Sequence, residues 1–134
     1  FEELIKITGP CVYWYKIVSD NSGNQIVAAF EAYKNDAFRN RAVPALKTRK
    51  RIDFNSEFLY VGKVKRNFYG RVIQHLGCFS VPQTQGLQLY YWAKEIKLKL
   101  ELNVVEFDRS MENLLPIIEL EIADRIHPLI GKHK

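Results

Sequence analysis

The chain is poor in cysteine, and this shortage bears on metal binding and on the cellular compartment. Only two of its 134 residues are cysteines, Cys11 and Cys78, and neither belongs to a CxxC pair or lies near histidines with zinc-ligand spacing. A structural zinc site is therefore not expected. One disulfide stays open as an alternative, but two isolated cysteines in a chain with a good core indicate buried thiols in a reducing compartment. The predicted location is the cytoplasm.

Long apolar runs are also missing. No stretch reaches the roughly 18 uncharged apolar residues of a membrane-spanning helix, and the apolar run from Leu114 to Ile118 is broken by Pro116. The sequence contains no secretory signal, no internal repeat and no low-complexity tract. We expect no membrane partner.

What the chain does have is apolar content and positive charge. At 15.7 kDa and 47% hydrophobic residues it can bury the core of one compact domain spanning residues 1–134. Its formal charge of +5 and pI near 9.2 favour a polyanionic partner, although ordinary soluble proteins also carry such an excess.

Hydrophobic patterning predicts two strands in the first half of the chain. An aromatic and β-branched run at Val12–Val18 precedes a turn-rich segment, and a similar run covers Glu57–Val64. Gln25–Tyr33 reads either as the hairpin partner of the first strand or as a short helix. The polar stretch Lys34–Asn55 is typical of a long surface connection.

The second half predicts three helices and a third strand. Asn67 suits a helix N-cap and Gly77 the position after the helix end. Further helices are expected at Gln85–Lys97 and Asn113–Ile126, and alternation predicts a strand at Leu98–Phe107. Pro116 is tolerable because it falls in the first helical turn. This order of elements indicates an α/β or α+β sandwich.

Three short motifs carry the chemistry. Cys11-Val12-Tyr13 lies in the first predicted strand, and Tyr60-Val61-Gly62-Lys63 in the second, followed by Arg71 and His75. At i and i+4, Arg71 and His75 leave the same helix face, beside its apolar arc. Glu119 stands nine residues before Pro128. In this order the motifs resemble those of the GIY-YIG nuclease family.

The resemblance implies a fold, a reaction and a set of residue roles. The fold is a small central three-stranded antiparallel sheet flanked by helices, and the reaction is metal-dependent endonucleolytic hydrolysis of DNA phosphodiesters. Tyr13 would deprotonate or position the attacking water, and Arg71 would neutralise the charge on the phosphate. Glu119 would bind one Mg²⁺ or Mn²⁺ ion. The remaining residues would support these groups: Tyr60 and Lys63 would position the phosphate, and His75 would hydrogen-bond a tyrosine or a water.

Each of these residues also has a plain structural explanation. Tyr13 belongs to an aromatic run that suits strand packing, and Arg71 with His75 suits a solvated basic face. Helical angles do not separate Glu119 from Glu121, because both flank the apolar arc of the last helix; only the spacing to Pro128, taken from the resemblance, favours Glu119.

The sequence departs from the family pattern at three places. Cys11 replaces a glycine of the first motif, which ordinary β geometry would tolerate. Gly131 stands where many members have an asparagine, a loss for which Lys132 or His133 would have to compensate. The third departure is a long basic insertion at about 19–56, whose cationic cluster is a candidate DNA contact or simply a solvated loop: Lys47, Arg49, Lys50 and Arg51.

Two other functions stay open on the sequence alone. One is a catalytically silent nucleic-acid-binding module of the same fold, and the other is a protein-interaction domain that uses Tyr90, Tyr91 and Trp92. If the chain is a nuclease, Tyr13, Tyr60, Arg71, His75 and Glu119 should converge. A tyrosine hydroxyl sealed in the core would instead favour the binding module.

Overall fold

The computed structural model describes residues 2–36, 42–77 and 85–133. Its strands and helices follow in the order α1 (Glu2–Ile5), β1 (Cys11–Ile17), α2 (Gly23–Lys34), η1 (Arg49–Arg51), β2 (Phe58–Val64), α3 (Phe68–Leu76), α4 (Leu89–Trp92), β3 (Leu100–Glu106), η2 (Arg109–Leu114) and α5 (Leu115–Ile126), where η marks a 3₁₀ helix. The predicted α+β class is confirmed.

The three strands form one antiparallel sheet in the order β2-β1-β3. Side chains alternate between its faces, so Tyr13 and Tyr15 of β1 point one way while Val12 and Trp14 point the other. The main core lies on the tyrosine face, and a smaller cluster that includes Val12 lies under α5. Because β2 is an edge strand, groups from both faces can approach its border.

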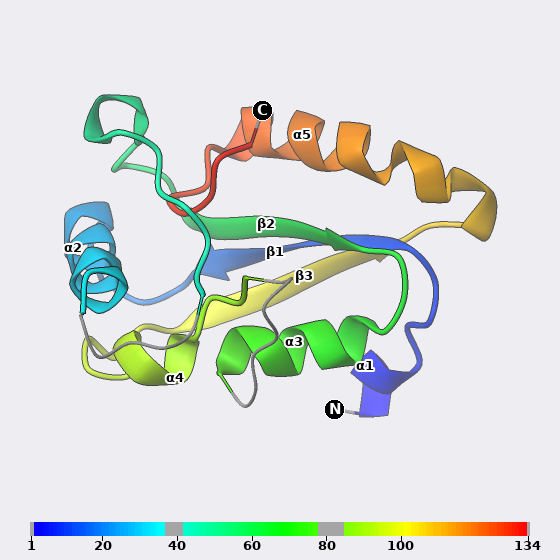
Figure 1. Ribbon diagram of the computed structural model, residues 1–134, viewed down its shortest axis with the longest axis horizontal. Helices are drawn as coiled ribbons and strands as arrows, with labels where there is room; N and C mark the ends of the chain where they lie inside the picture. The colour runs from blue at the N-terminus through cyan, green and yellow to red at the C-terminus, as the bar shows by residue number, and fades with distance from the viewer. Residues whose placement is uncertain (1, 37–41, 78–84, 134) are drawn as a thin grey trace.

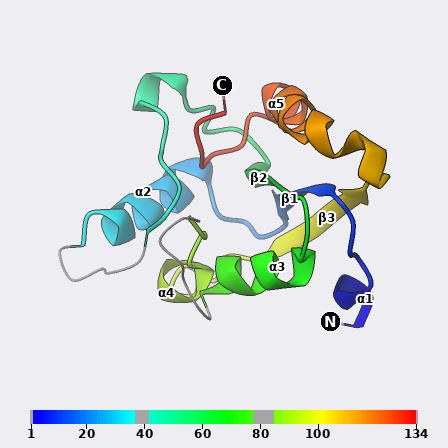
Figure 2. The same cartoon turned by 45° about the vertical axis from the view of Figure 1, so that its right-hand side comes forward.

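The helices cover the two faces unequally (Figure 1). Helix α5 crosses one face, and α3 and α4 lie beneath the other, with α2 at one end of the sheet. Turning the molecule by 45° keeps the C-terminal segment between α5 and the segment around η1 (Figure 2). The C-terminal segment and the segment around η1 are far apart in sequence but are neighbours in space.

Helix α3 has the limits that its capping residues predict. The Asn67 side chain accepts a hydrogen bond from the Gly70 amide at 3.1 Å, and the helix ends at Gly77, which has a φ of 102°. A left-handed residue at this position favours glycine because a Cβ atom would add strain.

The open choice for Gln25–Tyr33 is settled as a helix. Ser22 caps α2 by accepting a hydrogen bond from the Gln25 amide at 3.1 Å, and Ile26 and Phe30 of α2 are fully buried. Spacing of i and i+4 places both on the same face, which explains why a helix forms.

The predicted helix at Gln85–Lys97 is wrong over most of its length. Only α4, Leu89–Trp92, is helical there. Gln88, which precedes it, and Lys97, at the end of the predicted range, have positive φ angles of 56° and 54°. The Trp92 indole donates to the Leu87 carbonyl at 2.8 Å, so tertiary burial of the apolar residues overrides the helical propensity.

The predicted surface connection, Lys34–Asn55, is packed in part. Val43 and Ile52 belong to the core. The Gly131 amide donates to the Ala45 carbonyl at 2.9 Å, which ties this part of the insertion to the C-terminal segment. The insertion therefore helps to build the fold as well as covering its surface.

Two remaining expectations concern cysteine and the membrane. Cys11 is a free, buried thiol in ordinary strand geometry, as the first motif required, and burial raises its pKa to about 12. Cys78 lies outside the described residues. Among the described helices, none has the length and apolar character needed to cross a membrane.

Candidate active site

The two motif tyrosines lie on adjacent strands and share one face of the sheet. In the pairing of β1 with β2, Tyr13 lies opposite Gly62, and Tyr60 lies opposite Tyr15. A Cβ atom on Gly62 would come within 2.4 Å of the Tyr13 hydroxyl oxygen and 2.5 Å of its Cζ. Gly62 of the second motif is therefore required because any larger side chain would clash with the ring of Tyr13 of the first motif.

His75 fixes the hydroxyl of Tyr13. Its Nε2 lies 2.7 Å from the Tyr13 oxygen, and its Nδ1 accepts a hydrogen bond from the Leu87 amide at 3.0 Å. Because the amide can only donate, Nδ1 is unprotonated, and the proton of the neutral ring is on Nε2. His75 therefore donates to Tyr13, in keeping with the hydrogen bond to a tyrosine that the resemblance implied.

Arg71 reaches the same hydroxyl from one turn earlier in α3. Its Nε donates to the Tyr13 oxygen at 3.3 Å, Nη1 to the Gln74 side chain at 2.6 Å and Nη2 to the Gln85 carbonyl at 3.2 Å. These three hydrogen bonds fix the orientation of the Arg71 guanidinium plane. Gln74 is a positioning residue that the sequence motifs did not include, and its i+3 spacing from Arg71 was the available signal.

The burial of Tyr13 bears on its expected role in deprotonating or positioning the attacking water. Tyr13 is fully buried, and this desolvation raises the pKa of its phenol well above 10, despite the opposing effect of Arg71. A raised pKa disfavours the phenolate that a base would have to be. Tyr13 instead positions Arg71 and His75.

Tyr60 is the more accessible of the two tyrosines. It is half-buried, and the pKa of its phenol is raised by burial and by Glu119 but lowered by Arg71. Tyr60 therefore lies within electrostatic range of the Arg71 guanidinium on α3 and of the Glu119 carboxylate on α5. Lys63 and its partner Glu119 belong to the α5 face of the sheet, like Val12, the strand partner of Lys63. Arg71 approaches the tyrosine face, so the two charges act on Tyr60 from opposite faces of this edge.

Glu119 and Glu121, which the helical angles could not separate, have different partners. Glu119 accepts a hydrogen bond from Lys63 of β2 at 3.2 Å, whereas Glu121 pairs within the helix with Arg125 at 2.9 Å. The Glu119 side chain is 16% exposed and that of Glu121 is 59% exposed. Only Glu119 is linked to a motif residue.

Glu119 fits the limited protein ligation that Mg²⁺ needs. The described residues contain no group of three or more His, Cys, Asp or Glu side chains that could enclose a metal ion. Mg²⁺, however, keeps several waters and is often bound through one or two carboxylates together with substrate phosphates. A single, partly open carboxylate next to a lysine matches that mode of binding.

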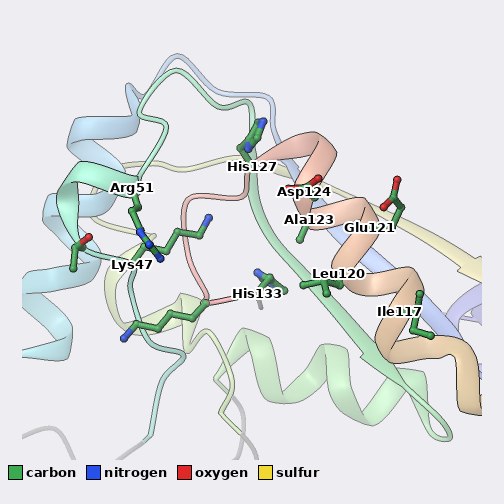
Figure 3. A pocket seen from close by; sticks show the side chains of 11 residues that line it. Lys47, Arg51, Ile117, Leu120, Glu121, Ala123, Asp124, His127 and His133 are labelled. Carbon is green, nitrogen blue, oxygen red and sulfur yellow. The ribbon is translucent and has the colours of Figure 1, made fainter.

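The basic cluster of the insertion divides into two parts. Lys47 and Arg51 line a groove between the insertion and α5, with His133 at its base (Figure 3). Arg49 instead pairs with Glu31 of α2, and neither Arg49 nor Lys50 is part of the groove lining. The cluster is therefore not one uniform phosphate-binding surface.

Gly131 and His133 complete the border of the site. Gly131 has a φ of 104°, and a Cβ atom there would lie 2.8 Å from Cε1 of His133 and 3.5 Å from Cε1 of Tyr60. The His133 ring centroid is 6.1 Å from that of Tyr60. Of the two residues expected to compensate for Gly131, His133 is the one that lies beside Tyr60.

The buried imidazole of His75 predicts a pH dependence of stability. Burial, aided by Arg71, holds the His75 pKa well below its ordinary value of 6.5. Below that pH the unfolded chain gains a proton that the folded chain does not, so the free energy of unfolding should fall by up to about 1.4 kcal/mol per pH unit. Urea denaturation between about pH 7 and about pH 5 measures this slope. A His75→Gln protein should have a shallower slope, and an unchanged slope would assign the effect to other groups.

Comparison with known proteins gives no match for this chain among protein-family models, curated proteins or solved structures.

Proposed function

We propose that the protein is a GIY-YIG-type endonuclease that hydrolyses phosphodiester bonds in DNA with one Mg²⁺ or Mn²⁺ ion. The observation that carries the proposal is that the strand of Tyr60 also bears Lys63, which pairs with Glu119 of α5 at 3.2 Å, while Arg71 of α3 donates to Tyr13 on the adjacent strand at 3.3 Å. A phosphate at this edge of the sheet would meet a cation, a phenol and a metal-binding carboxylate together. Hydrolysis needs these groups within reach of one phosphorus atom.

The chain's own groups would act mainly by electrostatics and positioning. Arg71, held by Tyr13, Gln74 and the Gln85 carbonyl, would donate its remaining N–H groups to a phosphate oxygen and stabilise the charge that grows there. Tyr60 would donate a hydrogen bond from its phenol to the phosphate. Lys63 would add a second positive charge.

Glu119 would hold the metal ion, with Lys63 as its neighbour at 3.2 Å. The ion would supply Lewis-acid stabilisation of the phosphate and lower the pKa of water in the site. In this mechanism no tyrosine has to act as a base. The mechanism is therefore compatible with the burial of Tyr13.

Substitution of the two tyrosines by phenylalanine should separate their roles. Tyr60→Phe removes a donor to the phosphate and should lower kcat about 100-fold with little change in melting temperature. Tyr13→Phe leaves the buried His75 N–H without its acceptor and should lower the free energy of unfolding by about 1–3 kcal/mol. Plasmid cleavage and thermal unfolding of both variants measure the contrast. A fully stable Tyr13→Phe protein as inactive as Tyr60→Phe would assign Tyr13 a direct role.

A catalytically silent nucleic-acid-binding module is the second candidate. The specific observation in its favour is the full burial of Tyr13, which keeps the hydroxyl of the first motif away from solvent and disfavours its phenolate. Such a module would keep Arg71, Lys63 and the basic groove for phosphate binding but would not cut.

Incubation of supercoiled plasmid with Mg²⁺ or Mn²⁺ distinguishes the candidates. Nicking or linearisation that EDTA abolishes supports the nuclease. Retardation in a gel without cleavage, independent of metal, supports the module. If the protein neither cuts nor retards the plasmid, both proposals fail and an interaction domain becomes the better explanation.

A further inference from the structure

A groove beside the candidate active site carries a combination of surface chemistries that the proposed hydrolysis does not use. It has a volume of about 700 Å³ and lies between α5, the segment around η1 and the C-terminal residues (Figure 3). This volume is in the range of about 300–1,000 Å³ that is typical of pockets for small ligands. An intact duplex is too bulky for such a space.

The walls of the groove differ in character. Lys47, Arg51 and Lys132 supply positive charge on one side. Helix α5 supplies the other side, where Ile117 is 66% exposed and Leu120 is 37% exposed. Exposed aliphatic side chains that face cations across a cavity suit a ligand with an apolar ring and a phosphate.

Helix α5 also places carboxylates at the groove. Glu121 and Asp124 both line it; Asp124 lies about one helical turn after Leu120. Glu121 forms an ion pair with Arg125. Carboxylates accept hydrogen bonds, and three of the four DNA bases carry an exocyclic amino group that donates them. The groove therefore offers partners for the phosphate, the ring face and the amino group of a nucleotide.

The groove borders the candidate active site at His133. His133 lines it, and Nε2 of this residue lies 3.0 Å from the Val61 carbonyl while its ring lies beside Tyr60. Helix α5 carries both Glu119 and the groove residue that follows it, Leu120. A strand whose phosphate lies at Tyr60 would thus enter the groove with its neighbouring nucleotide.

We propose that this groove binds an unpaired nucleotide next to the scissile phosphate, so that DNA with a single-stranded branch or frayed end is preferred over continuous duplex. The inference rests on the proposed nuclease function and names its substrate class. Charge complementarity and the size of the groove select a nucleotide as its occupant.

Cleavage of two DNAs of the same sequence, one with a single-stranded flap and one fully paired, tests the inference. Wild-type protein should cut the flap substrate with a kcat/KM about 10-fold higher. Arg51→Gln and Leu120→Asn should each remove most of that preference through KM. The matched controls Arg49→Gln and Leu114→Asn alter an arginine and an exposed leucine outside the groove and should keep it.

Equal kcat/KM on the two DNAs, or groove variants that behave like their controls, would overturn the inference while leaving the nuclease function intact. If wild-type protein cuts neither DNA, the nuclease function fails, and fluorescence anisotropy with labelled single-stranded oligonucleotides then decides on the groove. Cytosine-rich strands should bind more tightly than thymine-only strands, and Arg51→Gln and Leu120→Asn should weaken binding about 10-fold. Affinities unchanged in both variants would exclude a nucleotide site.

Discussion

Replacing Glu119 by alanine is expected to lower the rate of DNA cleavage at least about 1,000-fold while the affinity for DNA stays within about twofold. Glu119 is the carboxylate that contacts Lys63 at the edge of the sheet, and its loss would remove the proposed metal ligand. The basic groove is formed by other residues and is left intact. Nicking of supercoiled plasmid and fluorescence anisotropy with a labelled oligonucleotide measure the two quantities.

Glu121→Ala is the matched control, because it removes the same side chain two positions further along α5. Glu121 pairs with Arg125 on an exposed surface, and such pairs contribute about 0–1 kcal/mol to stability. Its cleavage rate at saturating DNA should stay near that of the wild type, because Glu121 lines the groove and would contribute to binding rather than to metal ligation. If Glu119→Ala cuts at the wild-type rate and Glu121→Ala is inactive, the metal ligand is Glu121 and the assignment to Glu119 is wrong.

Gly62→Ala is expected to cause a large loss of stability. The added methyl group would lie 2.4–3.0 Å from three atoms of the Tyr13 ring, which is fully buried and is held by His75 and Arg71. Overpacking of a core usually costs about 1–3 kcal/mol, and here the ring has little room to move. Thermal unfolding should show a melting temperature lower by several degrees.

The same substitution should also impair cleavage, because a displaced Tyr13 no longer orients Arg71. Glu101→Ala on β3, an exposed strand position, is the control for a strand substitution that creates no clash. If Gly62→Ala unfolds at the wild-type temperature and cuts normally, the close packing of Tyr13 on Gly62 is not a requirement of the fold.

Local sequence signals were sufficient wherever the structure depends on neighbours along the chain. Asn67 and Gly77 delimit α3 because a side-chain cap and a left-handed glycine act within one helical turn. Aromatic and β-branched runs predicted the first two strands, and alternation predicted the third, all to within two residues at each end. The spacing of Arg71 and His75 likewise placed both on one helix face.

Local signals failed where distant residues decide the conformation. The segment Gln85–Lys97 has the composition of a helix, yet burial of Leu87 and Trp92 against the core confines the helix to four residues. In the same way, the polar connection after α2 could not reveal that Val43 and Ile52 enter the core.

The candidate site divides along the same line. Sequence by itself determined which residue types were present and in which order, including the tyrosines, Arg71, His75 and the acidic pair Glu119 and Glu121. Only the tertiary structure decided their states: Tyr13 is sealed under α3, His75 is neutral because the Leu87 amide donates to it, and Glu119 meets Lys63. The physical reason is that desolvation and hydrogen bonding, which set the pKa of a side chain and its possible role, depend on neighbours that the fold brings from elsewhere in the chain.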